Sequence, residues 1–110
     1  MSYTHATPED LAETAKLVEQ EGRAIVSRIA DVRDQAALDA AVAEGVDRFG
    51  RLDVIVANAA VASYHKLWEL PEEHWDITLD VNLKGVWRTI KAGLPPMIDA
   101  GNGGAITIIS

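Results

Sequence analysis

Apolar residues recur along this chain in two alternating patterns, a helical spacing and a short continuous run. The helical spacing occurs three times, and each occurrence is followed by a run rich in apolar and β-branched residues. Runs of that length and composition are typical of strands. The pattern therefore predicts helices between residues 7 and 22, 34 and 50, and 71 and 101, and strands over residues 24–30, 52–57 and 105–109.

Residues typical of helix ends mark the boundaries of the first two helices. Thr7 precedes a proline and two acidic residues, and Asp34 precedes the second apolar stripe. Both are therefore predicted N-caps, because their side-chain oxygens can accept hydrogen bonds from the unpaired N–H groups of the first turn. Gly22 and Gly50 stand where a helix commonly ends in a left-handed residue, so they are predicted to close these helices.

The third helical pattern is longer and contains residues that disfavour a regular helix. Gly85 and the two prolines at residues 95–96 predict kinks or breaks within it. A helix–strand order repeated three times is typical of a parallel sheet with right-handed crossovers. We therefore predict an α/β fold in which a parallel sheet of three strands alternates with three helices.

The composition is that of one small globular domain. The chain has 110 residues and a mass of 11.9 kDa, of which 48% are hydrophobic and 25% charged. A net charge of -7 disfavours nucleic-acid partners, since a polyanion needs basic residues to neutralise it. No apolar run approaches the ~20 residues of a membrane span, and the N-terminus lacks the features of a secretory signal. The absence of cysteine excludes disulfides and thiolate sites and fits a cytoplasmic protein.

Metal ligands do not converge in the sequence. The three histidines lack partners at ligand spacing, apart from His65 and Glu69, which lie in a segment without a clear helical pattern. We therefore predict no metal site. No histidine lies in a usable motif near Ser110 either, so a hydrolase triad has no support.

Small polar residues follow each of the three predicted strands. They are Asp31, Asn58 and Ser110. Ligands of open parallel sheets bind beyond the carboxyl ends of the strands, so these side chains are candidates for a ligand site. Asp and Asn are also common turn and cap residues, and for Asp31 alone that plainer reading is equally good.

Four motifs in order resemble those of the short-chain dehydrogenase/reductase family. They are residues 31–32, 58–60, 80–85 and 104–110, and the resemblance covers almost all of the chain after Thr7. Residues 6–14 further resemble an actinobacterial, carveol-dehydrogenase-like, mycofactocin-associated subgroup. The resemblance implies a Rossmann-like domain that binds NAD, with NADP as an alternative, and transfers a hydride between the cofactor and a small-molecule alcohol or ketone.

The resemblance also implies roles for the residues that bind the cofactor. Asp31 would accept a hydrogen bond from the adenine amino group, and the backbone of Val32 would contact the adenine ring. Asn58, Ala59 and Ala60 match the family's Asn-Ala-Gly segment, which lies along the cofactor's ribose. Ala60 departs from the usual glycine, and its methyl group disfavours a positive φ, so the loop is expected to adopt a slightly different conformation.

Two further positions carry implied roles nearer to the reaction. Asn82 matches the helix asparagine of the family's catalytic tetrad, whose main-chain carbonyl holds a water at a helix irregularity. Without the family, an Asn that merely marks a kink is the better interpretation. Ser110 matches the first of two hydroxyl residues and would contact the cofactor near the nicotinamide, whereas the catalytic serine would be the next residue. Lys84 is interpreted as a solvated helix lysine.

Several parts of the family's site have no counterpart in residues 1–110. The sequence contains no Gly-rich phosphate-binding turn after a first strand and no Tyr-x-x-x-Lys motif. The resemblance therefore implies an incomplete domain, inactive alone, from a protein that forms homo-tetramers or dimers when complete. A non-catalytic remnant or interaction module that binds no cofactor is the alternative.

The resemblance also locates the predicted strands within the family's sheet. In the family order 3-2-1-4-5-6-7, the chain would supply strands three, four and five, so that the first two strands and the last are missing. Strands one and two, which separate strand three from strand four, would then be absent. Because an unpaired strand leaves its N–H and C=O groups without partners, we expect residues 24–30 to pair directly with residues 52–57. The alternative is that the first helix and strand are poorly anchored.

Overall fold

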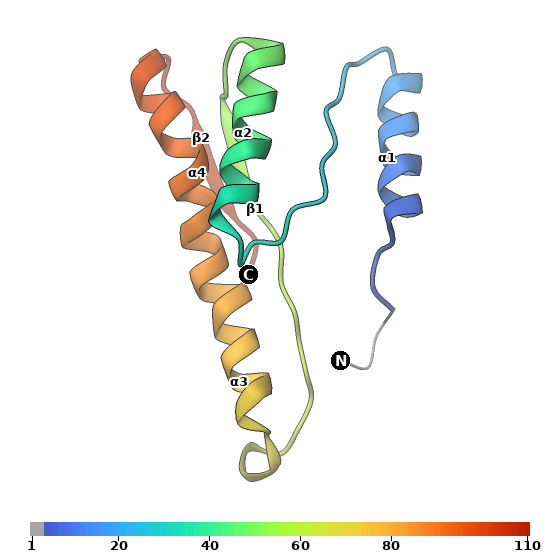
Figure 1. Cartoon of the computed structure of the whole chain (residues 1–110), viewed down its shortest axis with the longest axis vertical. Helices are drawn as coiled ribbons and strands as arrows, with labels where there is room; N and C mark the ends of the chain where they lie inside the picture. Colours follow the sequence, from blue (N-terminus) through green and yellow to red (C-terminus); the bar gives the residue numbers. More distant parts are fainter. Residues whose placement is uncertain (1–3) are drawn as a thin grey trace.

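The computed structural model describes residues 4–110 and divides into a packed region and an arm (Figure 1). We call residues 4–30 the arm and residues 35–109 the packed region. The elements, in chain order, are α1 (Pro8–Gln20), α2 (Gln35–Phe49), β1 (Val54–Ala57), η1 (Leu67–Glu69), α3 (Glu72–Leu79), η2 (Asp80–Lys84), α4 (Gly85–Ala100) and β2 (Ala105–Ile108).

Two parallel strands form the centre of the packed region. β1 and β2 pair in a register that sets Val54 against Ala105 and Ala57 against Ile108. Helices α2 and α4 lie side by side over one face of this sheet (Figure 1). Ile55 on β1 is buried beneath them, whereas Val54 is exposed, as expected when alternate side chains point to opposite faces.

The predicted helix caps are confirmed by the hydrogen bonds at both N-termini. Thr7 and Asp10 form a reciprocal capping box, in which the Thr7 N–H donates to Asp10 Oδ2 over 2.8 Å and the Asp10 N–H donates to Thr7 Oγ1 over 3.2 Å. The Asp34 carboxylate caps α2 by accepting from the Ala37 N–H. Gly22 and Gly50 follow these helices with φ of +75° and +82°, a left-handed conformation that favours glycine.

The third helix is continuous from Glu72 to Ala100, and its irregularity is a π-helical turn rather than a break. The segment η2 ends at Lys84, so Gly85 marks the return to α-helical geometry. The two prolines at residues 95–96 lie inside α4 without ending it, and the expectation of a break there is wrong. Neither proline has an N–H to donate to the carbonyl four residues earlier, so α4 continues with two helical hydrogen bonds fewer and packs there against α2 and β1.

The predicted strand over residues 24–30 is not formed, and its expected pairing with β1 is wrong. The structure assigns no strand to these residues, so the described sheet has two strands instead of the predicted three. Side chains hold the segment against α2: Arg48 Nη1 donates to the Ile25 carbonyl oxygen over 3.3 Å, and Arg28 forms a 2.8 Å ion pair with Glu44. The backbone is thus tethered beside α2, away from the open edge of β1.

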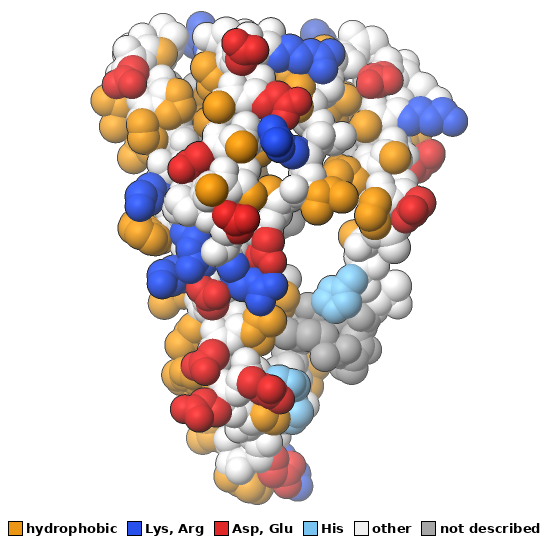
Figure 2. Space-filling model, viewed as in Figure 1, with side chains coloured by type: hydrophobic (Ala, Val, Ile, Leu, Met, Phe, Trp, Pro, Cys, Tyr) orange, Lys and Arg blue, Asp and Glu red, His pale blue; other side chains and the backbone are white. Residues whose placement is uncertain are grey.

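The molecule is more extended than a compact chain of its length. Its radius of gyration is 16.0 Å, whereas a compact domain of this length has about 13 Å. The accessible surface is 7931 Å², against roughly 6,000 Å² expected from the mass. Helix α1 contains no buried residue, and Figure 2 shows an opening between the lower part of the arm and the packed region. No helix among residues 4–110 is long and apolar enough to cross a membrane.

Candidate functional site

A hollow of about 410 Å³ lies beyond the carboxyl end of β1, on the side where ligands of parallel sheets bind. Four parts of the chain line it: His5 of the arm, residues 30–33, the loop of residues 59–61 and the third helix at Ile77 and Val81. The hollow thus brings together four of the predicted cofactor residues, namely Asp31, Val32, Ala59 and Ala60. These come from segments almost 30 residues apart in the sequence, so the fold itself creates this site.

The carboxylate of Asp31 is oriented by Arg33, two residues further along the chain. Arg33 Nε donates to both carboxylate oxygens, over 3.0 and 3.1 Å, and Arg33 Nη2 donates to Oδ2 over 2.7 Å. The Arg33 N–H adds a bond of 2.9 Å to Oδ1. These hydrogen bonds hold the pKa of Asp31 below its ordinary value, because they favour the charged form. The hollow therefore presents an ionised acceptor, about half of whose side-chain surface remains exposed.

Arg88 on α4 holds the same turn from the opposite side. Its Nη1 donates to the carbonyl oxygen of Val32 over 3.3 Å and to that of Asp80 over 3.2 Å. Its Nη2 forms a 2.9 Å ion pair with the Asp80 carboxylate. The sequence analysis missed Arg88, because residues 80 and 88 are eight apart, outside the three- or four-residue spacing that indicates an ion pair on a helix.

A close approach between the turn and the third helix depends on Gly85. A Cβ at this position would lie 2.7 Å from Val32 Cγ2, so a larger residue would push the turn away from the helix. Gly85 is buried and follows the π-helical segment directly. The Val32 side chain thus packs where the π-helical segment ends. This contact sets the distance between residues 31–33 and the third helix.

Asn82 lies in the π-helical segment and ties that segment to the loop after β1. Its Oδ1 accepts from the Val61 N–H and its Nδ2 donates to the Val61 carbonyl oxygen, both over 2.8 Å. The irregularity anticipated at Asn82 is therefore present, while the two-point amide contact was not anticipated. This contact holds the loop that carries Ala60. Ala60 has a negative φ, as has every other described residue except certain glycines.

Asn58 and Ser110 lie near the carboxyl ends of the two paired strands. Asn58 follows β1 directly, and the Ile109 N–H donates to the Ala57 carbonyl oxygen over 3.0 Å, which continues the pairing almost to Ser110. Both side chains are exposed, and neither lines the 410 Å³ hollow. The structure therefore places them at the same edge of the sheet as the hollow but outside its wall.

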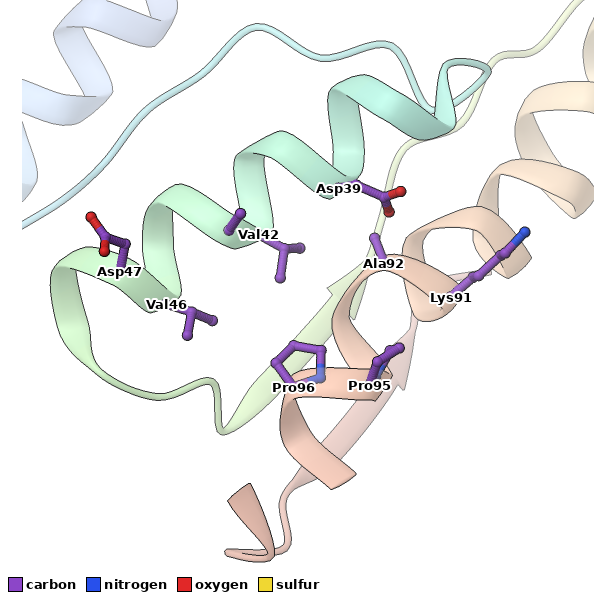
Figure 3. A pocket seen from close by; sticks show the side chains of 9 residues that line it. Asp39, Val42, Val46, Asp47, Lys91, Ala92, Pro95 and Pro96 are labelled. Carbon is purple, nitrogen blue, oxygen red and sulfur yellow. The ribbon is translucent and has the colours of Figure 1, made fainter. Parts of the chain in front are cut away.

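A larger hollow of about 680 Å³ lies between α2 and α4 (Figure 3). In it Val42 and Val46 of α2 face Ala92 and the two prolines of α4, with charged residues only at its margin. Such a lining is an apolar seam between two packed helices, away from the carboxyl ends of the strands. The 680 Å³ hollow offers few hydrogen-bonding groups to a ligand, so the 410 Å³ hollow is the better candidate for a ligand site.

His65 and His74 form a second polar cluster, separate from the hollow. His65 Nε2 and His74 Nδ1 lie 3.1 Å apart, which joins the loop after β1 to α3. Among residues 4–110 no group of three or more potential metal ligands comes together. The histidine pair therefore serves as a contact between two segments of the chain.

The residues of the hollow suit the adenosine end of a dinucleotide. An ionised carboxylate can accept a hydrogen bond from an exocyclic amino group, and the adjacent turn offers backbone groups and the apolar Val32 side chain to the edge and face of a base. The described residues contain no Gly-rich turn at a helix N-terminus, the element that binds a pyrophosphate. The fold and this hollow have the features expected of one side of a nucleotide-binding α/β domain.

Comparison with known proteins agrees with this class. The family model for short chain dehydrogenases matches residues 2–110. An uncharacterized NAD-dependent oxidoreductase of Mycobacterium tuberculosis is 53% identical over 110 residues, which are all of this chain and 40% of that protein. The (-)-trans-carveol dehydrogenase of Rhodococcus erythropolis is 40% identical over 111 residues, again 40% of its length. The chain thus spans about two fifths of these relatives.

A solved structure shows the same arrangement of elements. The crystal structure of carveol dehydrogenase from Mycobacterium avium in complex with NAD superposes with a TM-score of 0.94 at 50% identity, over 98% of this chain and 39% of that one. The chain belongs to the short-chain dehydrogenase family. The resemblance seen in the sequence motifs is therefore confirmed, including its likeness to carveol dehydrogenases.

Proposed function

We propose that this chain is the central segment of an NAD-dependent short-chain dehydrogenase of the cytoplasm, which oxidises the CH–OH group of a small alcohol or reduces the corresponding ketone. One observation carries the proposal: the 410 Å³ hollow brings the Asp31 turn and the Ala59–Ala60 loop together at the carboxyl edge of the sheet. NAD is favoured over NADP because the similar proteins include an NAD-dependent oxidoreductase and a carveol dehydrogenase solved with NAD.

Each residue of the site has a defined task in this proposal. Asp31 accepts a hydrogen bond from the adenine amino group, with its carboxylate held ionised by Arg33. The backbone of Val32 contacts the adenine ring, and residues 58–60 line the ribose. Ser110 contacts the nicotinamide end from beyond β2. The cofactor, when bound, supplies the hydride acceptor or donor.

Asn82 acts on the proton side of the reaction. Its amide oxygen and nitrogen both hydrogen-bond to Val61, and its main-chain carbonyl in the π-helical turn is the group that we propose holds a water. In a π-helical turn the carbonyl groups are displaced from the regular i→i+4 pattern, so one of them can accept from a ligand or a water. Asn82 is thus proposed as a positioning residue for proton transfer.

The complete protein is proposed to be a homodimer or homotetramer, and the 110-residue chain alone to be inactive. Leu83 and Trp87 share one face of the third helix and are 68% and 54% exposed. Exposed large apolar groups on one helix face are typical of subunit interfaces. The isolated chain lacks both a phosphate-binding turn and a Tyr-x-x-x-Lys motif, and therefore two of the groups that the reaction requires.

The first test is to sequence the DNA on both sides of the segment that encodes this chain. We expect an open reading frame with a Gly-rich turn upstream and a Tyr-x-x-x-Lys motif downstream. Stop codons immediately on both sides would overturn the enzyme proposal and favour the alternative, a non-catalytic remnant or interaction module.

The second test is the affinity of the complete protein for NADH, followed by nicotinamide fluorescence. Asp31→Ala removes the proposed adenine acceptor and should weaken binding roughly tenfold or more, since a hydrogen bond to a charged group contributes about 1.5–3 kcal/mol. Asp53→Ala is the matched control, because Asp53 forms a similarly exposed ion pair with Arg51 two residues away, at the other end of β1. Equal affinities for the Asp31 and Asp53 variants would contradict the assigned site.

A further inference from the structure

Arg88 and Gln35 form a reciprocal clasp between the third helix and the segment that carries the Asp31 turn. The Arg88 side chain donates to the Val32 carbonyl oxygen over 3.3 Å, and Gln35 Nε2 donates to the Arg88 carbonyl oxygen over 3.0 Å. The two bonds run in opposite directions between the same two segments, more than 50 residues apart in the sequence. The two bonds join the segment to the third helix at two separate points, in addition to the packing of Val32 against Gly85.

The clasp lies largely out of contact with solvent. The Arg88 side chain is only 12% exposed, so its charge needs a partner, and the Asp80 carboxylate supplies one at 2.9 Å. Exposed ion pairs contribute little, whereas breaking a desolvated pair leaves an unpaired charge. Arg88 is therefore fixed in one position, and the Val32 carbonyl that it contacts is fixed with it.

The same guanidinium reaches the π-helical turn. Arg88 Nη1 also donates to the main-chain oxygen of Asp80, the first residue of the segment that contains Asn82. One side chain thus contacts both the turn proposed to bind adenine and the helical irregularity proposed to serve the proton relay. A guanidinium suits this position because its planar group of donors can reach several acceptors at once, whereas a lysine ammonium acts as a compact point charge.

We propose that Arg88 is a positioning residue that sets the affinity of the site for the adenosine half of NAD. It holds the Val32 backbone, and with it the Asp31 carboxylate, at the wall of the hollow without touching the cofactor. This inference rests on the proposed function, because it assumes that adenine occupies the hollow. It goes further by assigning adenine affinity to a residue outside the hollow.

The test compares Arg88→Met and Arg88→Lys in the complete protein, with AMP and NADH as probes. Arg88→Met should raise the dissociation constants of AMP and NADH roughly tenfold, the effect of losing one charge-assisted hydrogen bond at the turn. The KM for the alcohol at saturating NAD should change less than about twofold, since the substrate does not contact this turn. Arg88→Lys retains the charge opposite Asp80 and should restore the thermal midpoint more completely than it restores AMP affinity.

Two further variants separate positioning from a general loss of stability. Gln35→Met breaks the clasp from the other side without removing a charge, and should weaken AMP binding about threefold. Arg51→Met removes an exposed arginine ion pair remote from the turn and should leave AMP affinity unchanged. If Arg88→Met does not fold, the Lys and Gln35 variants decide the question.

The outcomes distinguish this inference from the function on which it rests. Failure of the wild-type complete protein to bind NADH would overturn the proposed function. Normal NADH binding by the wild type, with unchanged AMP affinity in the Arg88 and Gln35 variants, would overturn the positioning role alone. If Arg88→Met weakened AMP binding and raised the KM for the alcohol by the same factor, Arg88 would act through overall stability.

Discussion

The arm and the packed region have equally good helix-capping residues but differ in how far their elements pack against the rest of the molecule. Thr7 caps α1 and Asp34 caps α2, and each helix is followed by a glycine with positive φ. Neither α1 nor α2 contains a fully buried residue, but α2 packs against α4. The buried hydrophobic residues among residues 4–110 lie in the packed region, and they are Ile55, Ala57, Val81, Ala92 and Met97. Local signals define a helix, but only partners in space bury it.

The same contrast separates the extended segment of the arm from the strands of the packed region. Residues 24–30 contain three β-branched residues, as many as β2, and Ile29 is nevertheless 73% exposed. β1 and β2 have each other as hydrogen-bond partners, whereas Ile25 and Arg28 of the extended segment bond to side chains of α2. A strand exists only as part of a ladder, so β propensity without a neighbour leaves an extended but unpaired chain.

Amide hydrogen exchange should give the largest difference between the two regions. In the 110-residue chain we expect amides of residues 24–30 to exchange near the unfolded rate and those of Val54–Ala57 to be slowed roughly a hundredfold or more. In the complete protein both sets should be protected, because strands one and two would then lie between them. Equal protection of both sets in the short chain would show that residues 24–30 pair there after all. Fast exchange at both would show that the packed region does not stay folded alone.

Two glycine substitutions, one in each region, should differ in their effect on the free energy of unfolding, by less than the difference in amide exchange. In Gly104→Ala the new Cβ would lie 2.5 Å from the Asp53 carbonyl oxygen, at φ of +154°. We expect a loss of about 2–4 kcal/mol in the free energy of unfolding, from the clash and the strained backbone together. In Gly22→Ala nothing lies within 4 Å of the new Cβ, so only the backbone penalty of about 1–2 kcal/mol remains, and it falls on the end of α1 and not on the packed region.

Urea unfolding followed by tryptophan fluorescence measures this pair, since all tryptophans lie in the packed region. Gly104→Ala should lower the midpoint, and Gly22→Ala should leave it unchanged because α1 does not support that region. A lower midpoint for Gly22→Ala would mean that the arm stabilises the packed region, contrary to the comparison.

The ion pair at the boundary between the two regions should give the smallest effect. The pKa of Asp31 lies below its ordinary value because Arg33 hydrogen-bonds to the charged carboxylate. Stabilisation from a lowered carboxyl pKa is present above the ordinary pKa and is lost as the pH falls through the lowered one. Arg33→Met should therefore raise the pKa of Asp31, measured from its carboxyl ¹³C shift, while Arg51→Met should not. An unchanged titration in Arg33→Met would contradict the assigned cause.

Much of the fold follows from the sequence because its helices are bounded by local chemistry. The caps at Thr7 and Asp34, and the parallel pairing of the two later strands, were all predicted and are confirmed. The fate of residues 24–30 could not be predicted from their composition, since it depends on which strand lies beside them. The continuity of α4 through residues 95–96 likewise depends on its packing against α2 and β1, which the local sequence does not show.

The candidate site was predictable only where a motif marked it. Asp31, Val32 and the residues after β1 were found from strand ends and family motifs, and the structure brings four of them into one hollow. Arg88 has no motif: its importance lies in contacts with Val32, which is 56 residues away in the sequence. Periodicity places Arg88 on a helix face but does not identify the backbone carbonyl that it contacts.

A titration with NADH, run side by side on the complete protein and on the 110-residue chain, tests the central claim most directly. The claim is that this chain holds the adenine side of an NAD site that other segments must complete. Nicotinamide fluorescence should show saturable micromolar binding by the complete protein and none below millimolar concentrations by the short chain. Micromolar binding by the short chain, or no binding by the complete protein, would contradict it.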